Sequence, residues 1–229
     1  MRIRPMCIFL ICLFSASALA KDITVKAVKG TVEVRRGVSE EWTKAKIGDL
    51  LKPEDSMRTG EKSSATIETD TRRILVPPMT IIDFSDFRQL SQEDFLLKLA
   101  MENILAVPPR DRDDIEIPAA AVLHGANKEK EDAPVYSDET IGRMQLQGAK
   151  VLFDNAYYAT SILKSKATFR NYPDLRSDFG ARITVALAFE KLRLDNEAIT
   201  EYSMLGQQDL TAAQKKDVQA SLERLKAAK

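Results

Sequence analysis

Hydrophobic and polar positions alternate in the first half of the chain, and turn residues interrupt them at short intervals. Across residues 23–34 the β-branched apolar residues recur with a period of about two, which is typical of strands with one buried face. Residues 65–69 and 72–76 read as a hairpin pair, and residues 79–84 form another strand-like run. Many short strands at this spacing predict a small antiparallel β sandwich or barrel.

The pattern changes to a helical period at Ser91. This serine is an expected N-cap with acidic residues directly after it, and apolar residues then recur at helical spacing until Pro108 and Pro109. We therefore expect a helix over about residues 91–106, and we expect it to pack on the sheet.

The second half, from about Ser137, is helical throughout. Five apolar stripes with a helical period predict five helices, and Thr211 with Gln214 forms a capping box at the start of the last one. The fold class expected for the whole chain is therefore α+β, with an N-terminal antiparallel β domain and a C-terminal all-α domain of helical hairpins.

A charged, apolar-poor stretch separates the two patterns. We expect a β-rich domain over residues 21–125, which includes the helix at about 91–106. A linker over residues 126–136 and a helical domain over residues 137–229 follow. Each half has its own apolar period, so each is expected to close its own core. The alternative is that the helix over residues 91–106 bridges the halves and makes one shared core.

Residues 1–20 have the pattern of a secretory signal peptide. Arg2 and Arg4 precede an uncharged stretch of 16 residues, which ends in Ala18-Leu19-Ala20 before Lys21. This stretch is shorter than the roughly 20 residues of a membrane-spanning helix. We expect cleavage between Ala20 and Lys21, which removes both cysteines, and a periplasmic or secreted protein with no stable membrane span.

The β-rich half also carries a run of motifs. Gly30-Thr31-Val32 is followed by Trp42, by Gly48-Asp49, and then by Asp55 with Arg58-Thr59-Gly60 before Ser63-Ser64-Ala65. Over roughly residues 23–90 this order resembles the FecR-type domain, a β-rich module of bacterial envelope proteins. The founding FecR proteins are membrane-spanning regulators of a sigma factor. Because this chain begins with a cleavable signal, the resemblance implies the module and not the regulatory role.

The helical half resembles tetratricopeptide repeats. Ala186, Phe189, Ala198 and Tyr202 fall at the small and aromatic positions of that repeat, and Asp154-Asn155 recurs 41 residues later as Asp195-Asn196. The resemblance implies a small solenoid whose concave face binds a peptide or a partner segment. A plain five-helix bundle without a groove is the alternative.

Few residues point to chemistry. The chain has 34 basic and 34 acidic residues, a balance that argues against a general nucleic-acid binder. His124 is its one histidine, and no G-x-S-x-G motif or glycine-rich phosphate loop is present. Asp83 and Asp86 could serve a carboxylate-dependent hydrolase, but nothing in the sequence distinguishes them from surface acids. We therefore expect no catalytic residues, no metal site and no cofactor.

These observations predict a non-enzymatic interaction or scaffold protein of the bacterial cell envelope, which binds a protein or peptide partner through either half. Trp42, Tyr158 and Tyr202 are the candidate partner-binding residues, although core or rim packing is the favoured role for Trp42. The alternatives are a module that binds peptidoglycan or another glycan, and an envelope hydrolase.

Overall fold

The computed structural model describes residues 23–70, 72–107 and 136–227. The expected signal peptide with its cleavage site between Ala20 and Lys21, the histidine His124, and all of the expected linker except Tyr136 lie outside these ranges.

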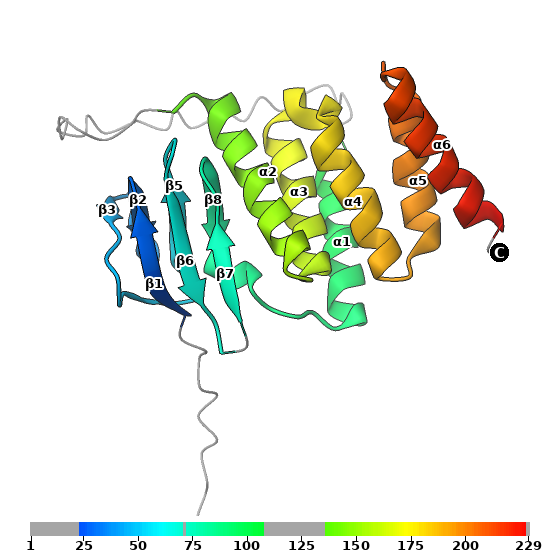
Figure 1. Cartoon of the computed structure of the whole chain (residues 1–229). Helices are drawn as coiled ribbons and strands as arrows, with labels where there is room; N and C mark the ends of the chain where they lie inside the picture. Colours follow the sequence, from blue (N-terminus) through cyan, green and yellow to red (C-terminus); the bar gives the residue numbers. More distant parts are fainter. Residues whose placement is uncertain (1–22, 71, 108–135, 228–229) are drawn as a thin grey trace, which may run out of the picture.

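In the described part of the chain, eight strands form two four-stranded antiparallel sheets (Figure 1). One sheet has the order β4-β1-β6-β7 and the other the order β3-β2-β5-β8. The strands are β1 (Ile23–Lys29), β2 (Val32–Arg35), β3 (Trp42–Lys44), β4 (Leu50–Leu51), β5 (Ser56–Thr59), β6 (Ser64–Glu68), β7 (Arg73–Val76) and β8 (Thr80–Asp83). The α+β class, with strands first and helices last, is confirmed.

The apolar period of two produces a single core between the sheets. Val25 and Ile67 from one sheet and Val34, Met57 and Ile82 from the other are buried in the same cluster. The hairpin expected from the pattern is present, because β6 and β7 pair antiparallel with Ile67 opposite Ile74.

The described residues contain six α-helices, and the last five are arranged in sequence order, with α2 next to the sheets and α6 farthest from them (Figure 1). They are α1 (Gln92–Leu105), α2 (Asp138–Asp154), α3 (Tyr158–Asn171), α4 (Phe179–Lys191), α5 (Asp195–Gly206) and α6 (Ala212–Ala227). Short 3-10 helices, η1 (Phe84–Asp86) and η2 (Pro173–Ser177), connect some of these elements. The expected capping box is confirmed, since the Thr211 backbone N–H donates to the Gln214 side chain at 2.9 Å and Thr211 Oγ1 accepts from the Gln214 backbone at 3.3 Å.

Helix α2 completes the core of the β half. Val151 and Leu152 of α2 and Tyr157, which follows it, belong to the apolar cluster that the two sheets enclose. The helix packs along β8 and also contacts β7, and each of these is an edge strand of its sheet. The two halves therefore share buried apolar residues, which differs from the expectation that each half closes its own core.

Helix α1 does not cover a sheet, so that part of the sequence interpretation is wrong. Ser91 caps it as expected, accepting a hydrogen bond from the Asp94 backbone at 3.1 Å. Its buried residues Phe95 and Leu99 pack in the helical cluster, where the Phe95 ring lies 6.3 Å from that of Phe189. The sequence period identified the helix but not the surface that it covers.

The helices form two equivalent pairs, α2 with α3 and α4 with α5. The turn inside each pair contains a residue with positive φ, Ala156 at 62° and Arg193 at 60°. In each turn, the backbone N–H of the next residue donates to a carbonyl of the preceding helix. Tyr157 donates to Leu152 in the first pair, and Leu194 donates to Phe189 in the second.

The repeat offset is therefore the 37 residues between Ala156 and Arg193. The offset of 41 residues taken from Asp154-Asn155 and Asp195-Asn196 is wrong. Asn155 ends helix α2, whereas Asp195 begins helix α5, so these two pairs of residues occupy different positions in the repeat.

Small residues occupy the contact points of both pairs. In the first pair Ser161 of α3 donates a hydrogen bond to the Ala149 carbonyl of α2 at 2.8 Å. In the second pair Ala186 and Ala198 take the corresponding places, and both are completely buried. Small side chains here let the two helices of a pair approach closely.

Candidate partner-binding groove

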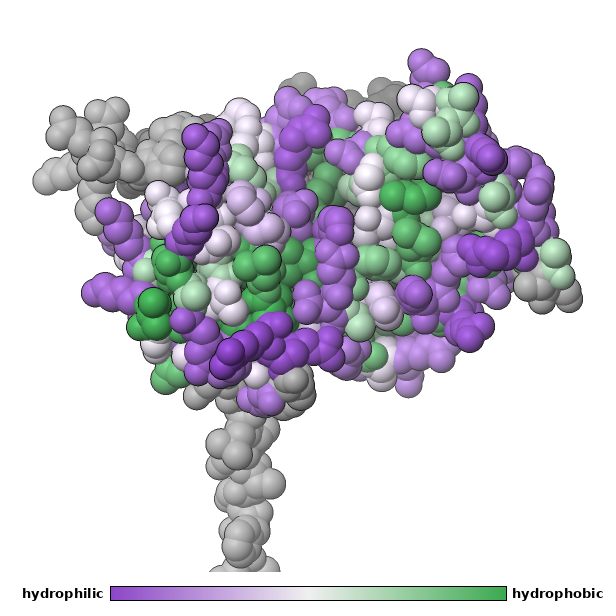
Figure 2. Space-filling view, in the orientation of Figure 1, coloured by the Kyte–Doolittle hydropathy of each residue, from purple (hydrophilic) through white to green (hydrophobic). Residues whose placement is uncertain are grey.

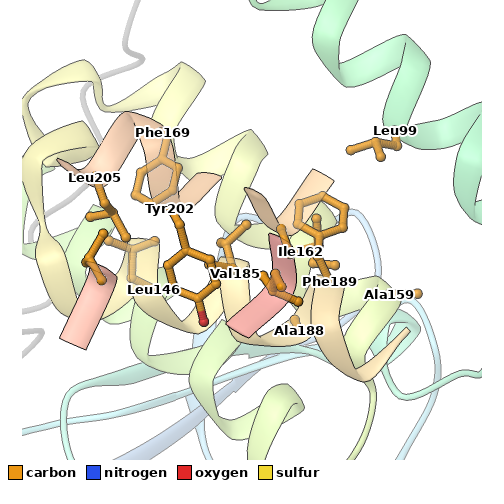
Figure 3. Packing of buried hydrophobic residues seen from close by; sticks show 14 of the residues in the cluster. Leu99, Leu146, Ala159, Ile162, Phe169, Val185, Ala188, Phe189, Tyr202 and Leu205 are labelled. Atoms are coloured by element: carbon orange, nitrogen blue, oxygen red, sulfur yellow. The ribbon is translucent and has the colours of Figure 1, made fainter. Parts of the chain in front are cut away.

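A groove of about 520 Å³ lies between α1, α3, α4 and α5. Its apolar lining includes Phe169 of α3 and Val185 and Phe189 of α4, each less than a tenth exposed. Leu99 projects from α1 toward Phe189 (Figure 3). Met204 of α5 also lines the groove. A groove with this apolar lining suits an inserted apolar side chain.

Three charged side chains that line the groove form a network. The Glu201 side chain, 7% exposed, accepts hydrogen bonds from Lys166 Nζ at 2.8 Å and from Arg182 Nη2 at 3.0 Å. The Arg182 guanidinium also lies 5.8 Å from the centroid of the Phe169 ring. These contacts hold α3, α4 and α5 in a fixed arrangement around the groove.

Two further arginines, Arg170 and Arg176, line the groove. Arg170 of α3 lies 3.3 Å from Glu102 of α1, so an ion pair joins these two walls. Arg176 in η2 is exposed, and its Nε donates to the Phe169 carbonyl at 3.1 Å. An approaching carboxylate would meet this guanidinium at the groove entrance.

The candidate residue Tyr202 is not a surface residue, so partner contact is the wrong role for it in this structure. Its side chain has no exposed area, and its hydroxyl donates to Glu190 Oε1 at 2.6 Å. Burial, together with the hydrogen bond to Glu190, raises the pKa of Tyr202. Tyr202 is a core residue between α4 and α5.

Tyr158 is half-buried at the start of α3 and is not among the residues lining the groove. Its ring packs edge-on against Phe153 of α2 with centroids 5.4 Å apart. The structure therefore does not bring Tyr158 and Tyr202 together at one surface.

Trp42 lies on β3, an edge strand of its sheet. The Arg58 guanidinium is 4.5 Å from the Trp42 ring centroid, and the Arg35 guanidinium is 5.3 Å away. Arg58 also lies 5.7 Å from the Tyr136 ring and forms an ion pair with Glu33 at 2.7 Å. These contacts fit the packing role favoured for Trp42.

Several motif residues of the β half build turns. The Asp55 side chain, 3% exposed, accepts hydrogen bonds from the backbones of Lys52 and Gly37, each at 3.0 Å, and from Arg36 at 2.8 Å. Burial alone would raise the pKa of Asp55, but these hydrogen bonds and the Arg36 charge lower it. Thr59 similarly holds β8, since its hydroxyl accepts from the Thr80 backbone at 3.0 Å.

Gly30 and Ser63 show why the motif needs a glycine. Gly30 has a φ of 72°, and a Cβ there would lie 2.5 Å from the Ser63 hydroxyl oxygen. That oxygen accepts from the Thr31 backbone at 2.8 Å. Gly30 and Ser63 therefore have a structural role in the turn between β1 and β2.

Asp83 and Asp86 converge on one lysine. Lys164 Nζ of α3 lies 2.6 Å from an Asp83 oxygen and 3.2 Å from an Asp86 oxygen, and its side chain is 8% exposed. Burial alone would lower the pKa of Lys164, but the two carboxylates raise it. Burial alone would raise the pKa of Asp83, but the charge and hydrogen bond of Lys164 lower it. The pKa of Asp86 is raised, because the effect of burial there exceeds that of Lys164. This triad joins the β half to α3.

The sequence interpretation missed the buried charges on the helices. The repeat offset that relates Ala156 to Arg193 also relates Lys164 to Glu201, and both are charged residues on the inner face of the second helix of a pair. Charged residues in phase with an apolar stripe are the signal that could have identified them.

Within the described ranges, no helix is long and apolar enough to cross a membrane. The same residues contain no cluster of three or more His, Cys, Asp or Glu side chains arranged to hold a metal ion. Comparison of the chain with protein-family models, with curated proteins and with solved structures gave no match. The FecR-type and tetratricopeptide resemblances therefore rest on sequence motifs.

Proposed function

We propose that this chain is an exported, non-enzymatic interaction protein of the bacterial cell envelope, which holds a segment of a partner protein in the groove between α1, α3, α4 and α5. The observation that carries this proposal is the groove's lining, which combines apolar side chains with a fixed network of charges in which Glu201 binds both Lys166 and Arg182. The two helix pairs support a tetratricopeptide-like reading of the helical half.

The groove's chemistry indicates the kind of segment that would fit. An apolar side chain would lie on Phe169, Val185 and Phe189, and a neighbouring carboxylate would face Arg176. We therefore infer a peptide segment with an apolar anchor next to an acidic residue.

The two alternative functions have less support. Asp83 and Asp86, the candidate hydrolase carboxylates, both bind Lys164 and act as a link between the two halves. Trp42 has two arginines within 5.3 Å of its ring centroid, so its ring already has partners in the sheet. We therefore propose partner binding in preference to peptidoglycan binding and to hydrolysis.

The proposed location rests on residues 1–20 and on the FecR-type motifs. Mass spectrometry of the protein from its native host is expected to give Lys21 as the N-terminal residue. An intact Met1 or a lipid-modified cysteine would contradict export with cleavage.

Photo-crosslinking in the native host tests partner binding. A photoreactive amino acid at Met204, which is 43% exposed and lines the groove, is expected to give a discrete adduct with an envelope protein. The matched control carries the same group at Leu75, which is exposed on β7. Adducts of equal yield and identity from the two positions would contradict a groove-specific partner.

A further inference from the structure

Helix α1 contacts the other helices through a row of three residues. Phe95, Leu99 and Glu102 lie at positions i, i+4 and i+7, so they follow one another along one side of the helix. The Phe95 ring lies 6.3 Å from that of Phe189, and Glu102 forms an ion pair with Arg170 at 3.3 Å. Two apolar residues and a carboxylate of α1 therefore already occupy one side of the groove.

This row has the chemistry of the proposed partner segment, an apolar anchor next to an acidic residue. Phe95, Leu99 and Phe189 are each less than a tenth exposed, so their contact is almost completely shielded from water. On the face of the molecule shown in Figure 2, hydrophobic residues are instead interspersed with hydrophilic ones. Helix α1 is thus an internal example of a segment that this surface accepts.

Helix α1 is held less completely than the helix it packs on. Both α1 and α3 have 14 residues, but α3 buries seven of them and α1 buries two. Leu97, Met101 and Ile104 of α1 are each more than half exposed in the described part of the chain. Glu102 Oε2 is buried and accepts no hydrogen bond from the described residues, which costs free energy.

We propose that α1 occupies part of the partner site, and that the partner is a helical segment which displaces α1. This segment carries the same row, with apolar residues at i and i+4 and an acidic residue at i+7. The inference rests on the proposed function, because it names the kind of segment that the groove holds. The open part of the groove, lined by Arg176 and Met204, gives the segment its first contact, and it then competes with α1 for Phe189 and Arg170.

Displacement and a fixed α1 have opposite consequences. Because α1 belongs to the same chain, it competes with a partner at a high effective concentration. Only molecules in which α1 has left its place bind the partner, so the apparent affinity is reduced by that fraction. A substitution that weakens the docking of α1 is therefore expected to strengthen partner binding. If α1 were a permanent wall of the groove, the same substitution would remove part of the site and weaken binding.

Fluorescence anisotropy with a labelled synthetic peptide of residues 90–107 tests this exchange on the mature chain. Leu99→Glu in the chain is expected to lower the dissociation constant of the peptide at least about tenfold, because it weakens α1 docking and leaves Phe189 and Arg170 in place. Leu75→Glu is the matched control, since Leu75 is exposed on β7. Equal affinities for the two variants, or no binding to either, would overturn the proposal.

A charge exchange tests where the peptide lies, with substitutions at a partly exposed ion pair. The wild-type chain is expected to prefer the unchanged peptide to a peptide with Glu102→Arg. In the Arg170→Glu chain this preference is expected to reverse, with at least about fivefold tighter binding of the Glu102→Arg peptide. The same preference in both chains would contradict docking of the peptide at the site of α1.

Photo-crosslinking from Met204 in the native host separates this inference from the proposed function. Leu99→Glu is expected to raise the yield of the Met204 adduct at least about threefold, and Leu75→Glu is expected to leave it unchanged. A lower yield with Leu99→Glu would overturn the displacement of α1 while partner binding stands. Peptide exchange without any Met204 adduct would instead contradict the proposed function, and with it the identity of the partner segment.

Discussion

Gly148 of α2 lies so close to Ile81 of β8 that a Cβ at this position would overlap the Ile81 carbonyl oxygen. β8 is the last strand of its sheet, and α2 packs along it. An uncovered edge strand exposes backbone groups that invite pairing with other chains. Glycine at this position lets the backbone of α2 cover that edge directly.

The first prediction is that Gly148→Ala destabilises the protein, although alanine is the better helix former by about 1 kcal/mol. Overlap with a backbone oxygen cannot be relieved by a side-chain rotation, so we expect a net loss of about 1–3 kcal/mol. The measurement is the free energy of unfolding in urea.

Gly206→Ala at the end of α5 is the matched control. A Cβ there would lie 3.9 Å from Val218, an ordinary contact, so this substitution is expected to be neutral or slightly stabilising. Equal effects of the two substitutions would show that the close approach of α2 to β8 does not contribute to stability.

The second prediction concerns the triad that joins the two halves. Lys164→Met is expected to lower the free energy of unfolding at neutral pH by about 2 kcal/mol. This is below the roughly 3–5 kcal/mol seen for fully buried pairs, because the Asp83 side chain is 38% exposed. Lys150→Met is the control, since Lys150 forms only an exposed pair with Asp154, and we expect it to cost at most about 0.5 kcal/mol.

The pH dependence distinguishes this account from simple loss of packing. Without Lys164, burial raises the pKa of Asp86 in the folded state further above the ordinary value of 3.8, and Asp83 loses the neighbour that most lowers its pKa. As the pH falls, the folded variant therefore binds protons at a higher pH than the unfolded chain does, which stabilises the folded state. The difference in free energy of unfolding between wild type and variant should shrink as the pH falls from neutral toward 4. A difference in free energy of unfolding that is independent of pH would contradict the charge-pairing role of Lys164.

The third prediction is that Asp55→Asn destabilises the β half by about 2 kcal/mol at neutral pH, because an amide cannot accept all the hydrogen bonds that this carboxylate receives. The folded-state pKa of Asp55 is lowered, so its contribution is present above the ordinary pKa of 3.8 and is lost as the pH falls through the folded value.

The difference between wild type and Asp55→Asn should therefore narrow below pH 3.8. Thermal unfolding across that range measures it. Asp209→Asn, at an exposed position before α6, is the control and should have little effect at any pH. A constant difference down to low pH would show that Asp55 acts through packing alone.

The sequence was sufficient where a local pattern determines a local structure. The alternation around Ile67 and Ile74 predicts the hairpin of β6 and β7, and Ser91 and Thr211 predict helix starts, because caps and strand periods depend on neighbouring residues.

The sequence was insufficient where two distant elements share a surface. Val151 and Leu152 follow the same helical period as the rest of their stripe, so nothing local shows that they complete the sandwich core. Lys164 and Glu201 resemble surface charges until the fold brings their partners to them. The groove likewise depends on where α1 packs, and the period of α1 does not specify that.

The central claim, that the groove holds a partner segment, is tested most directly by photo-crosslinking from Met204 in two charge-reversal backgrounds. Arg176→Glu reverses a charge at the groove entrance, whereas Lys216→Glu makes the same change at an exposed position on α6. Our account predicts that Arg176→Glu lowers the yield of the Met204 adduct at least about fivefold, corresponding to about 1 kcal/mol, and that Lys216→Glu leaves it unchanged. An adduct yield that is the same in both variants, or no adduct with any envelope protein, would contradict the claim.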